Sequence, residues 1–221
     1  MKDTYGNNQC KVFVVAVPTE TGGVPIRLRT YDTTTDRAIP ALIWQAARAT
    51  SAALTYFTPI TIDDTKYCDG GFGWSNPIEE AIAETHSLWP NRPIGCLLSI
   101  GTGLEDAIQL DAKYKKGLTQ MLLTTGLPKI SFRKSVAEYC VETLTSCERV
   151  HRAVVGDLKG RGIHGRYFRF NVNQGMFDIG LDEWERIGSM ITFTKSYMTH
   201  GDREEARRKV TEFLLDPNRT S

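Results

Sequence analysis

The sequence predicts an α/β fold, and three features of its pattern support that prediction. Residues 11–17 (KVFVVAV) are almost wholly apolar and rich in β-branched side chains, as in a strand buried on both faces. Residues 94–100 (IGCLLSI) form a second apolar run of strand length. Between them, Pro40 begins an alanine-rich helical segment that extends to about Ala53, and another helical segment follows Pro77. This alternation of strands and helices favours an α/β sheet.

Shorter elements complete the expected order. Residues 26–31 alternate well enough for a more exposed strand, and residues 65–68 form a short strand before Asp69. Pro59 and Asp63-Asp64 mark the loop that leads to it. The helix after Pro77, with Asn76 as its N-cap, places one set of side chains on a single face: Ile78, Ala81, Ile82, Thr85 and Trp89.

The second half of the sequence is predicted to be mainly helical. Residues 111–147 have a helical pattern broken near Gly126, and residues 166–172 (RYFRFNV) alternate as a strand does. A helix is expected from Leu181 to about His200. In the last helix we expect Asp202 as the cap, Glu205 three residues on, and the ion pairs Glu204–Arg208 and Glu205–Lys209.

Composition excludes several classes of protein. Lys and Arg total 27 against 26 Asp and Glu, so the net charge of +1 gives no case for nucleic-acid binding. The five cysteines have no CxxC spacing and the four histidines are scattered, which predicts reduced thiols and no metal site. No apolar run approaches the roughly 20 residues of a membrane span, and no signal segment opens the chain. We therefore expect a cytoplasmic protein.

The strongest candidate site is Asp69-Gly70-Gly71 at the end of the short strand. The two glycines allow a sharp turn, and a carboxylate between a strand and a helix lies where α/β proteins usually place their chemistry. The alternative is an ordinary Asp-Gly turn. Taken alone, these three residues leave both interpretations open.

Other candidates have weaker support. Ser99-Ile-Gly-Thr-Gly103 could hold a phosphate on backbone N–H groups, but it lacks a P-loop lysine, so a structural turn is the preferred interpretation. No Gly-x-Ser-x-Gly elbow is present in the sequence. We expect Ser99 to be a packed hydroxyl and Cys68 a core thiol.

A basic segment surrounds His151 and His164. Its six cations are Arg149, Arg152, Lys159, Arg161, Arg166 and Arg169, which outnumber Glu148 and Asp157. Such a segment could contact anionic lipid headgroups, although a solvated face is the commoner explanation.

Five segments together resemble the patatin-like phospholipase (PNPLA) family in order and spacing. They are residues 11–17 (KVFVVAV), 43–57 (IWQAARATSAA followed by Tyr56-Phe57), 67–71 (YCDGG), 76–84 (Asn76-Pro77 with Ala81 and Glu84) and 98–103 (LSIGTG). Residues 166–172 and 181–184 look like the tail of its fungal members. The combination of ARATSAA with Asp-Gly-Gly is specific, whereas either alone would be weak.

The resemblance implies a three-layer α/β/α fold, of which this chain would hold the C-terminal part. It also implies lipid acyl hydrolysis by a Ser-Asp dyad without a metal or organic cofactor, on an acyl lipid or phospholipid, with peripheral membrane contact. Asp69 would accept the serine proton directly, and Gly70 and Gly71 would complete the DGA/G motif. Leu54 and Ser75 depart from the usual proline and asparagine.

The resemblance also predicts a missing part. The oxyanion loop and the serine elbow of the family belong before Lys11, so we expect residues 1–10 to be a short lead-in, 11–184 the C-terminal part of the domain, and 185–221 a helical extension. A base without its nucleophile predicts no activity for this chain alone. The alternatives are a non-catalytic lipid- or partner-binding remnant, or half of a split hydrolase whose serine comes from a partner chain.

Overall fold

The computed structural model describes residues 10–20, 24–53, 57–71, 73–103, 147–161, 163–176, 179 and 183–216. The chain divides into two compact units. Unit 1 comprises Met1–Pro90 and Pro128–Cys147, and unit 2 comprises Asn91–Leu127 and Glu148–Ser221. The helices expected within 111–146 lie outside the described residues.

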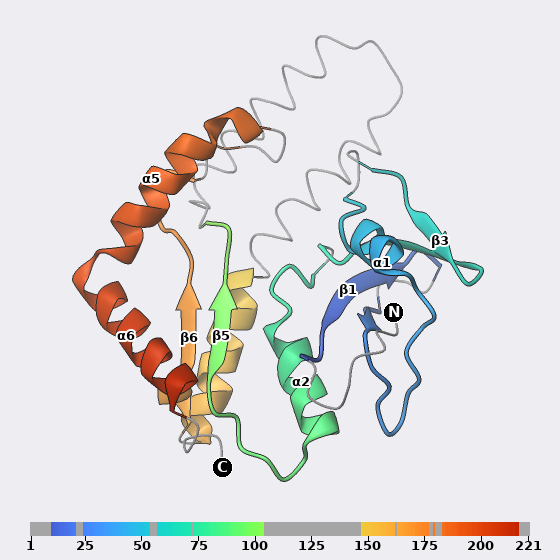
Figure 1. Ribbon diagram of the computed structural model, residues 1–221, viewed down its shortest axis with the longest axis horizontal. Coiled ribbons are helices and arrows are strands. Elements are labelled where there is room, and N and C mark those ends of the chain that lie inside the picture. Colours follow the sequence, from blue (N-terminus) through green and yellow to red (C-terminus); the bar gives the residue numbers. More distant parts are fainter. Residues whose placement is uncertain are drawn as a thin grey trace. The chain divides into compact units, whose positions relative to one another are not determined.

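Unit 1 contains a four-stranded antiparallel sheet in the order β2-β1-β4-β3 (Figure 1). Its strands are β1 (Phe13–Pro18), β2 (Ile26–Arg29), β3 (Ile60–Ile62) and β4 (Thr65–Asp69). β1 is central because both its edges are paired, and its residues 15–18 are all buried. This confirms the prediction of a buried strand from KVFVVAV.

The sequence predicted the short strand that is β4 and the Asp63-Asp64 loop, but it missed β3 and therefore the β3–β4 hairpin. Asp63 and Asp64 connect the two strands with φ values of 47° and 62°. Two-residue hairpin turns of this type need positive φ at both positions, and Asp tolerates that conformation better than most residues. The Asp-Asp pair between two short β-branched runs was the signal available in the sequence.

Helix α1 (Ile43–Thr50) packs against β1, β3 and β4, and Figure 1 shows it crossing the sheet of unit 1. The helix is shorter than predicted because Leu42 is still extended and serves as its N-cap. Small side chains allow a close approach to the sheet, as the alanine content suggested. The core consists of Ala16, Leu28, Ala41, Ala46, Ala49, Ile62 and Tyr67.

Helix α2 (Ile78–Leu88) follows the loop after β4. Its N-cap is Pro77, so the prediction of Asn76 as the cap is wrong. The side-chain amide of Asn76 instead donates a hydrogen bond to the Cys147 carbonyl oxygen, at 3.1 Å. The predicted apolar face is also only partly correct, because Trp89 is 38% exposed and the charged Glu84 is buried.

Unit 2 contains a two-stranded parallel sheet, β5 (Leu97–Ile100) with β6 (Tyr167–Phe170). Residues 147–160 are helical and bury Val150, Val154 and Leu158, which recur at every fourth position. Short 3-10 turns lie at η1 (His164–Arg166) and η2 (Trp184–Arg186). The expected strands in 94–100 and 166–172 are therefore confirmed, although each is shorter than its pattern.

The last two helices are α5 (Ile187–Met198) and α6 (Gly201–Leu215). His200 is the N-cap of α6, so the prediction of Asp202 as the cap is wrong. The Glu205–Lys209 pair forms at 2.7 Å, whereas Glu204 pairs with Arg207 at 3.8 Å and Arg208 pairs with Glu212. Within the described residues, no helix is long and apolar enough to cross a membrane.

Candidate functional site

Asp69 is the last residue of β4, as the sequence predicted. Two neighbouring segments of the chain fix the position of its backbone. It lies opposite Ala16 in the antiparallel register with β1, and its backbone N–H donates to the Ala52 carbonyl oxygen at 3.2 Å. The central strand and the segment after α1 thus hold the backbone of Asp69 in place.

The side chain of Asp69 is held by the glycine turn that follows it. The Gly71 N–H donates to Asp69 Oδ1 at 3.0 Å. Gly70 is required by close packing, since a Cβ there would lie 3.0 Å from the Val15 carbonyl oxygen. The Trp74 N–H donates to the Gly70 carbonyl oxygen at 3.0 Å and closes the turn. The Asp-Gly turn therefore also holds the Asp69 carboxylate in position, so the two interpretations of this motif describe the same structure.

Burial governs the electrostatics of this site. Burial raises the pKa of Asp69 above its ordinary value, and the hydrogen bond from the Gly71 N–H opposes that rise. Within the part of the chain that the structure describes, no ion pair reaches the Asp69 carboxylate. A carboxylate whose pKa is raised toward neutrality is a better proton acceptor for chemistry than a fully solvated one.

The structure excludes the neighbouring Cys68 as a nucleophile. Its thiol is 9% exposed and contacts the Val17 carbonyl oxygen at 3.4 Å. Burial and the neighbouring Asp69 charge raise the pKa of Cys68, which disfavours the reactive thiolate. The prediction of a core thiol is confirmed.

A buried ionic cluster in unit 1 was not predicted from the sequence. The Glu84 carboxylate, which is 3% exposed, accepts hydrogen bonds from Arg29 Nε at 2.5 Å and Nη2 at 3.1 Å, Arg27 Nη1 at 2.9 Å and the Tyr31 hydroxyl at 3.0 Å. The cluster joins α2 to β2, so both ends of the 70–77 loop are anchored. Arginines at alternate positions of a strand, Arg27 and Arg29, were the available signal.

The cluster also shifts the pKa values of its members. Burial alone would raise the pKa of Glu84, but its bonds to Arg29 and Tyr31 outweigh that effect and lower it. Burial, together with the bond to Glu84, raises the pKa of Tyr31 above the range in which a phenol titrates in ordinary buffers. These four residues are a charged structural link rather than a proton-transfer group.

The glycine turn after β5 is a structural turn in unit 2. The Gly101 N–H donates to the Phe170 carbonyl oxygen and the Gly103 N–H to Asn171 Oδ1, each at 2.8 Å. Two N–H groups that could have faced a phosphate are therefore occupied. Ser99 is 7% exposed and its hydroxyl accepts from Arg169 Nη1 at 2.8 Å, which confirms a packed hydroxyl.

The basic segment does not form one solvated face. Arg169 is half-buried and pairs with Glu148 at 3.1 Å, while Arg166 donates to the Ile94 carbonyl oxygen. His151 shares a hydrogen bond of 2.9 Å with the Tyr167 hydroxyl, and burial lowers its pKa. Other members of the segment, such as Arg149 and Lys159, remain exposed.

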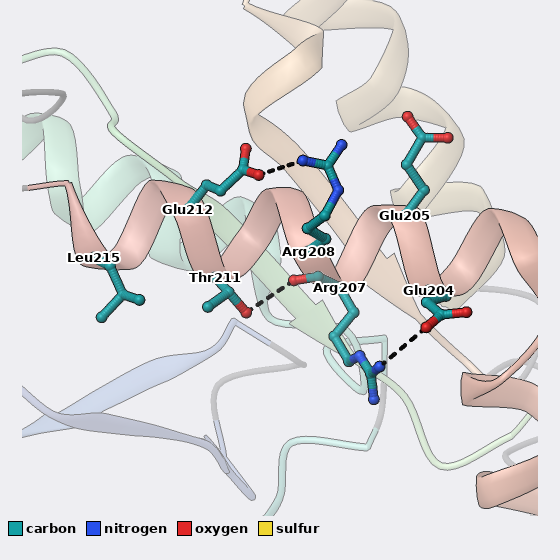
Figure 2. A pocket seen from close by; sticks show the side chains of 7 residues that line it. All are labelled: Glu204, Glu205, Arg207, Arg208, Thr211, Glu212 and Leu215. Atoms are coloured by element: carbon teal, nitrogen blue, oxygen red, sulfur yellow. Dashed lines mark hydrogen bonds and ion pairs between the residues drawn. The ribbon is translucent and has the colours of Figure 1, made fainter.

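A surface depression on α6 is also part of unit 2. Figure 2 shows its lining, with Arg207 directed toward Glu204 and Arg208 toward Glu212 along the helix. The Thr211 hydroxyl donates to the Arg207 carbonyl oxygen at 3.0 Å. Because these charges are paired within the helix, the depression offers little for recognising a ligand.

The structure mixes strands and helices and has a half-buried aspartate at the end of a strand, which is consistent with part of an α/β fold. A family model described as patatin-like phospholipase matches residues 7–82, a segment that includes Asp69, Gly70 and Gly71. This match and the relatives below relate the chain to the patatin-like phospholipase family.

Three relatives illustrate the similarity. Calcium-independent phospholipase A2-gamma of Oryctolagus cuniculus is 32% identical over 181 residues, covering 81% of this chain and 20% of the relative. Phospholipase A I of Arabidopsis thaliana is 33% identical over 141 residues, covering 64% of this chain and 9% of the relative. The 85/88 kDa calcium-independent phospholipase A2 of Rattus norvegicus is 26% identical over 188 residues, covering 80% of this chain and 22% of the relative. The chain therefore spans about a fifth, or less, of the length of each.

Proposed function

We propose that this chain supplies the aspartate part of a Ser-Asp lipid acyl hydrolase site, with a phospholipid or other acyl lipid as the substrate. Asp69 is the proposed proton acceptor. The observation that carries the proposal is its half-buried carboxylate at the end of β4, fixed by the Gly71 N–H and with a raised pKa. The similarity to phospholipases supports the lipid class of substrate.

The proposed reaction needs a serine that this sequence does not present in a Gly-x-Ser-x-Gly elbow. As the serine oxygen attacks the ester carbonyl carbon, its hydroxyl proton passes to Asp69. When the acyl–oxygen bond breaks, Asp69 returns that proton to the departing alcohol. Asp69 then accepts a proton from water as the water oxygen attacks the acyl carbon of the acyl-enzyme. When the acyl–serine bond breaks, Asp69 returns that proton to the serine oxygen, and the fatty acid is released.

The proposal predicts a dependence on a second polypeptide segment. Alone, the chain should not be labelled by a fluorophosphonate probe, because its sequence contains no Gly-x-Ser-x-Gly elbow to activate a serine. Co-expression with a patatin-like segment carrying Gly-x-Ser-x-Gly should restore both labelling and hydrolysis of a p-nitrophenyl ester. Asp69→Asn should abolish the restored hydrolysis, because an amide cannot accept the serine proton.

Asp64→Asn is the matched control, because Asp64 is exposed in the β3–β4 turn and Asn also tolerates positive φ. It should leave the restored hydrolysis unchanged. Asp69-dependent labelling of the isolated chain would refute the need for a second segment. Restored hydrolysis that survives Asp69→Asn would refute the role of Asp69.

A further inference from the structure

Thr50, the last residue of α1, uses its side chain to bond another element of unit 1. A hydroxyl in a helix commonly donates to a carbonyl oxygen of its own helix, as Thr85 does to Ala81 at 2.7 Å in α2. The Thr50 hydroxyl instead donates to the Val15 carbonyl oxygen in β1, 35 positions earlier, also at 2.7 Å. This bond therefore ties the end of α1 to the central strand of the sheet.

The Thr50 bond lies close to the backbone of the candidate aspartate. A Cβ at Gly70, the residue after Asp69, would be 3.0 Å from the same Val15 carbonyl oxygen. Two residues beyond Thr50, the Ala52 carbonyl oxygen accepts the Asp69 N–H at 3.2 Å. The end of α1 therefore contacts β1 through the Thr50 side chain and β4 through the backbone, directly before the glycine turn.

The spacing between the end of α1 and β1 leaves little room for a different side chain. Ala49 and Ala52, on either side of Thr50, are fully buried, each with 0% exposure. A methyl carbon usually lies about 3.3 Å or more from a carbonyl oxygen, against 2.7 Å for the Thr50 hydroxyl. Valine, which has a methyl group in place of the hydroxyl, would therefore shift one of the two segments by roughly half an ångström. A shift of α1 would move Ala52 away from the Asp69 N–H, and a shift of β1 would move Val15 against the glycine turn.

We propose that Thr50 is a positioning residue for Asp69. Its hydroxyl fixes the spacing between the end of α1 and β1, and so holds Asp69 where the Gly71 N–H meets its carboxylate. Thr50 acts through Val15 and Ala52 rather than on the carboxylate itself. The consequence for hydrolysis rests on the proposed function of Asp69, whereas the position of the carboxylate does not. The two proposals can therefore fail separately.

Carbon-13 NMR of the full 221-residue chain, labelled at its aspartate carboxyl carbons, tests the positioning role without any hydrolysis. The signal of Asp69 is identified by its loss in Asp69→Asn. Burial holds the pKa of Asp69 above its ordinary value, so a displaced carboxylate that reaches more water should titrate at a lower pH. Thr50→Val should therefore lower the pKa of Asp69. Thr50→Ser keeps the hydroxyl and should leave the titration of Asp69 close to that of the wild type.

The matched control is Thr85→Val, which removes a hydroxyl of the same part-buried class and the same bond length from α2. Its bond stays within one helix, so its loss should leave the titration of Asp69 unchanged. In the complemented hydrolase, Thr50→Val should lower kcat roughly tenfold with little change in KM, because a small displacement of the proton acceptor slows the reaction without removing substrate contacts. Thr50→Ser should recover most of that rate, and Thr85→Val should retain it.

Circular dichroism checks that each variant is folded. If Thr50→Val does not fold, Thr50→Ala compared with Thr50→Ser isolates the same hydroxyl without adding a methyl group, and Thr50→Ala alone should lower the pKa of Asp69. The same Asp69 titration with and without the Thr50 hydroxyl would overturn the positioning role, and so would an equal shift in Thr85→Val. A shift specific to Thr50, together with restored hydrolysis that survives Asp69→Asn, would support the positioning role and overturn the proposed function alone.

Discussion

Replacing Glu84 with glutamine should destabilise unit 1 by an amount that depends on pH. The carboxylate accepts four hydrogen bonds, three of them from Arg27 and Arg29, and is 3% exposed. Glutamine keeps one acceptor oxygen but directs an N–H₂ group at arginine donors. Arg29, itself buried, is left with the more distant Asp36 carboxylate at 4.0 Å. Removing one partner of a buried ion pair costs about 3–5 kcal/mol, so we expect a loss of about 3 kcal/mol in the free energy of unfolding near neutral pH.

The pH dependence follows from the lowered pKa of Glu84. A carboxyl group whose pKa is lower when folded contributes its stability above its unfolded pKa, and loses it as the pH falls through the folded pKa. The gap between wild type and Glu84→Gln in urea unfolding should therefore close in acid. The exposed Glu79→Gln on the same helix is the control and should unfold like the wild type. A gap below about 1 kcal/mol, or one that stays constant into acid, would refute the assignment of Glu84 as a charged link.

Two further predictions concern the glycine turn and its aspartate. Gly70→Ala should lower the free energy of unfolding by about 1–3 kcal/mol, because its Cβ would meet the Val15 carbonyl oxygen at 3.0 Å. Gly156→Ala, with nothing within 4 Å of its Cβ, should unfold in urea no earlier than the wild type, and equal effects of the two substitutions would contradict the packing argument. Asp69→Asn should raise the unfolding midpoint near neutral pH, because a half-buried carboxylate with a raised pKa disfavours the folded state once it is charged. That gain should vanish as the pH falls below the unfolded pKa of Asp69, and an Asp69→Asn variant that melts earlier than the wild type would contradict the burial argument.

Local patterns predicted the strands well, because burial on both faces leaves a run of apolar, β-branched residues. Residues 11–17 illustrate this, since β1 is Phe13–Pro18, while the alternation of residues 166–172 predicted β6 at Tyr167–Phe170. Each strand boundary differs from its predicted range by one or two residues. Boundaries were less accurate. Pro40 was expected to start a helix, but Leu42 remains extended and the helix begins at Ile43. Helix ends depend on which carbonyl and N–H groups find partners, and those partners are often distant in sequence.

The candidate site likewise has features that adjacent residues predicted and features that they did not. That Asp69 ends a strand before two glycines was predictable from adjacent residues, and the structure agrees. Its neighbours were not predictable. The Ala52 carbonyl oxygen is 17 positions before Asp69 in the sequence, and the Val15 contact that requires Gly70 is more distant still. The role of Asp69 as a proton acceptor stays a prediction until the complementation experiment is done.

The sequence by itself determined most of the described strands and helices, although not β3. It also determined that Cys68 and Ser99 are packed side chains and that the chain resembles patatin-like phospholipases. It did so because burial and turns depend on residues within a few positions of one another. Only the tertiary structure decided that the first sheet is antiparallel, that Glu84 on α2 is enclosed by two arginines of β2, and that α1 directs Ala46 and Ala49 inward and Trp44 outward. Each of these features depends on contacts between residues far apart in sequence. A local pattern carries no information about which distant side chain will contact it.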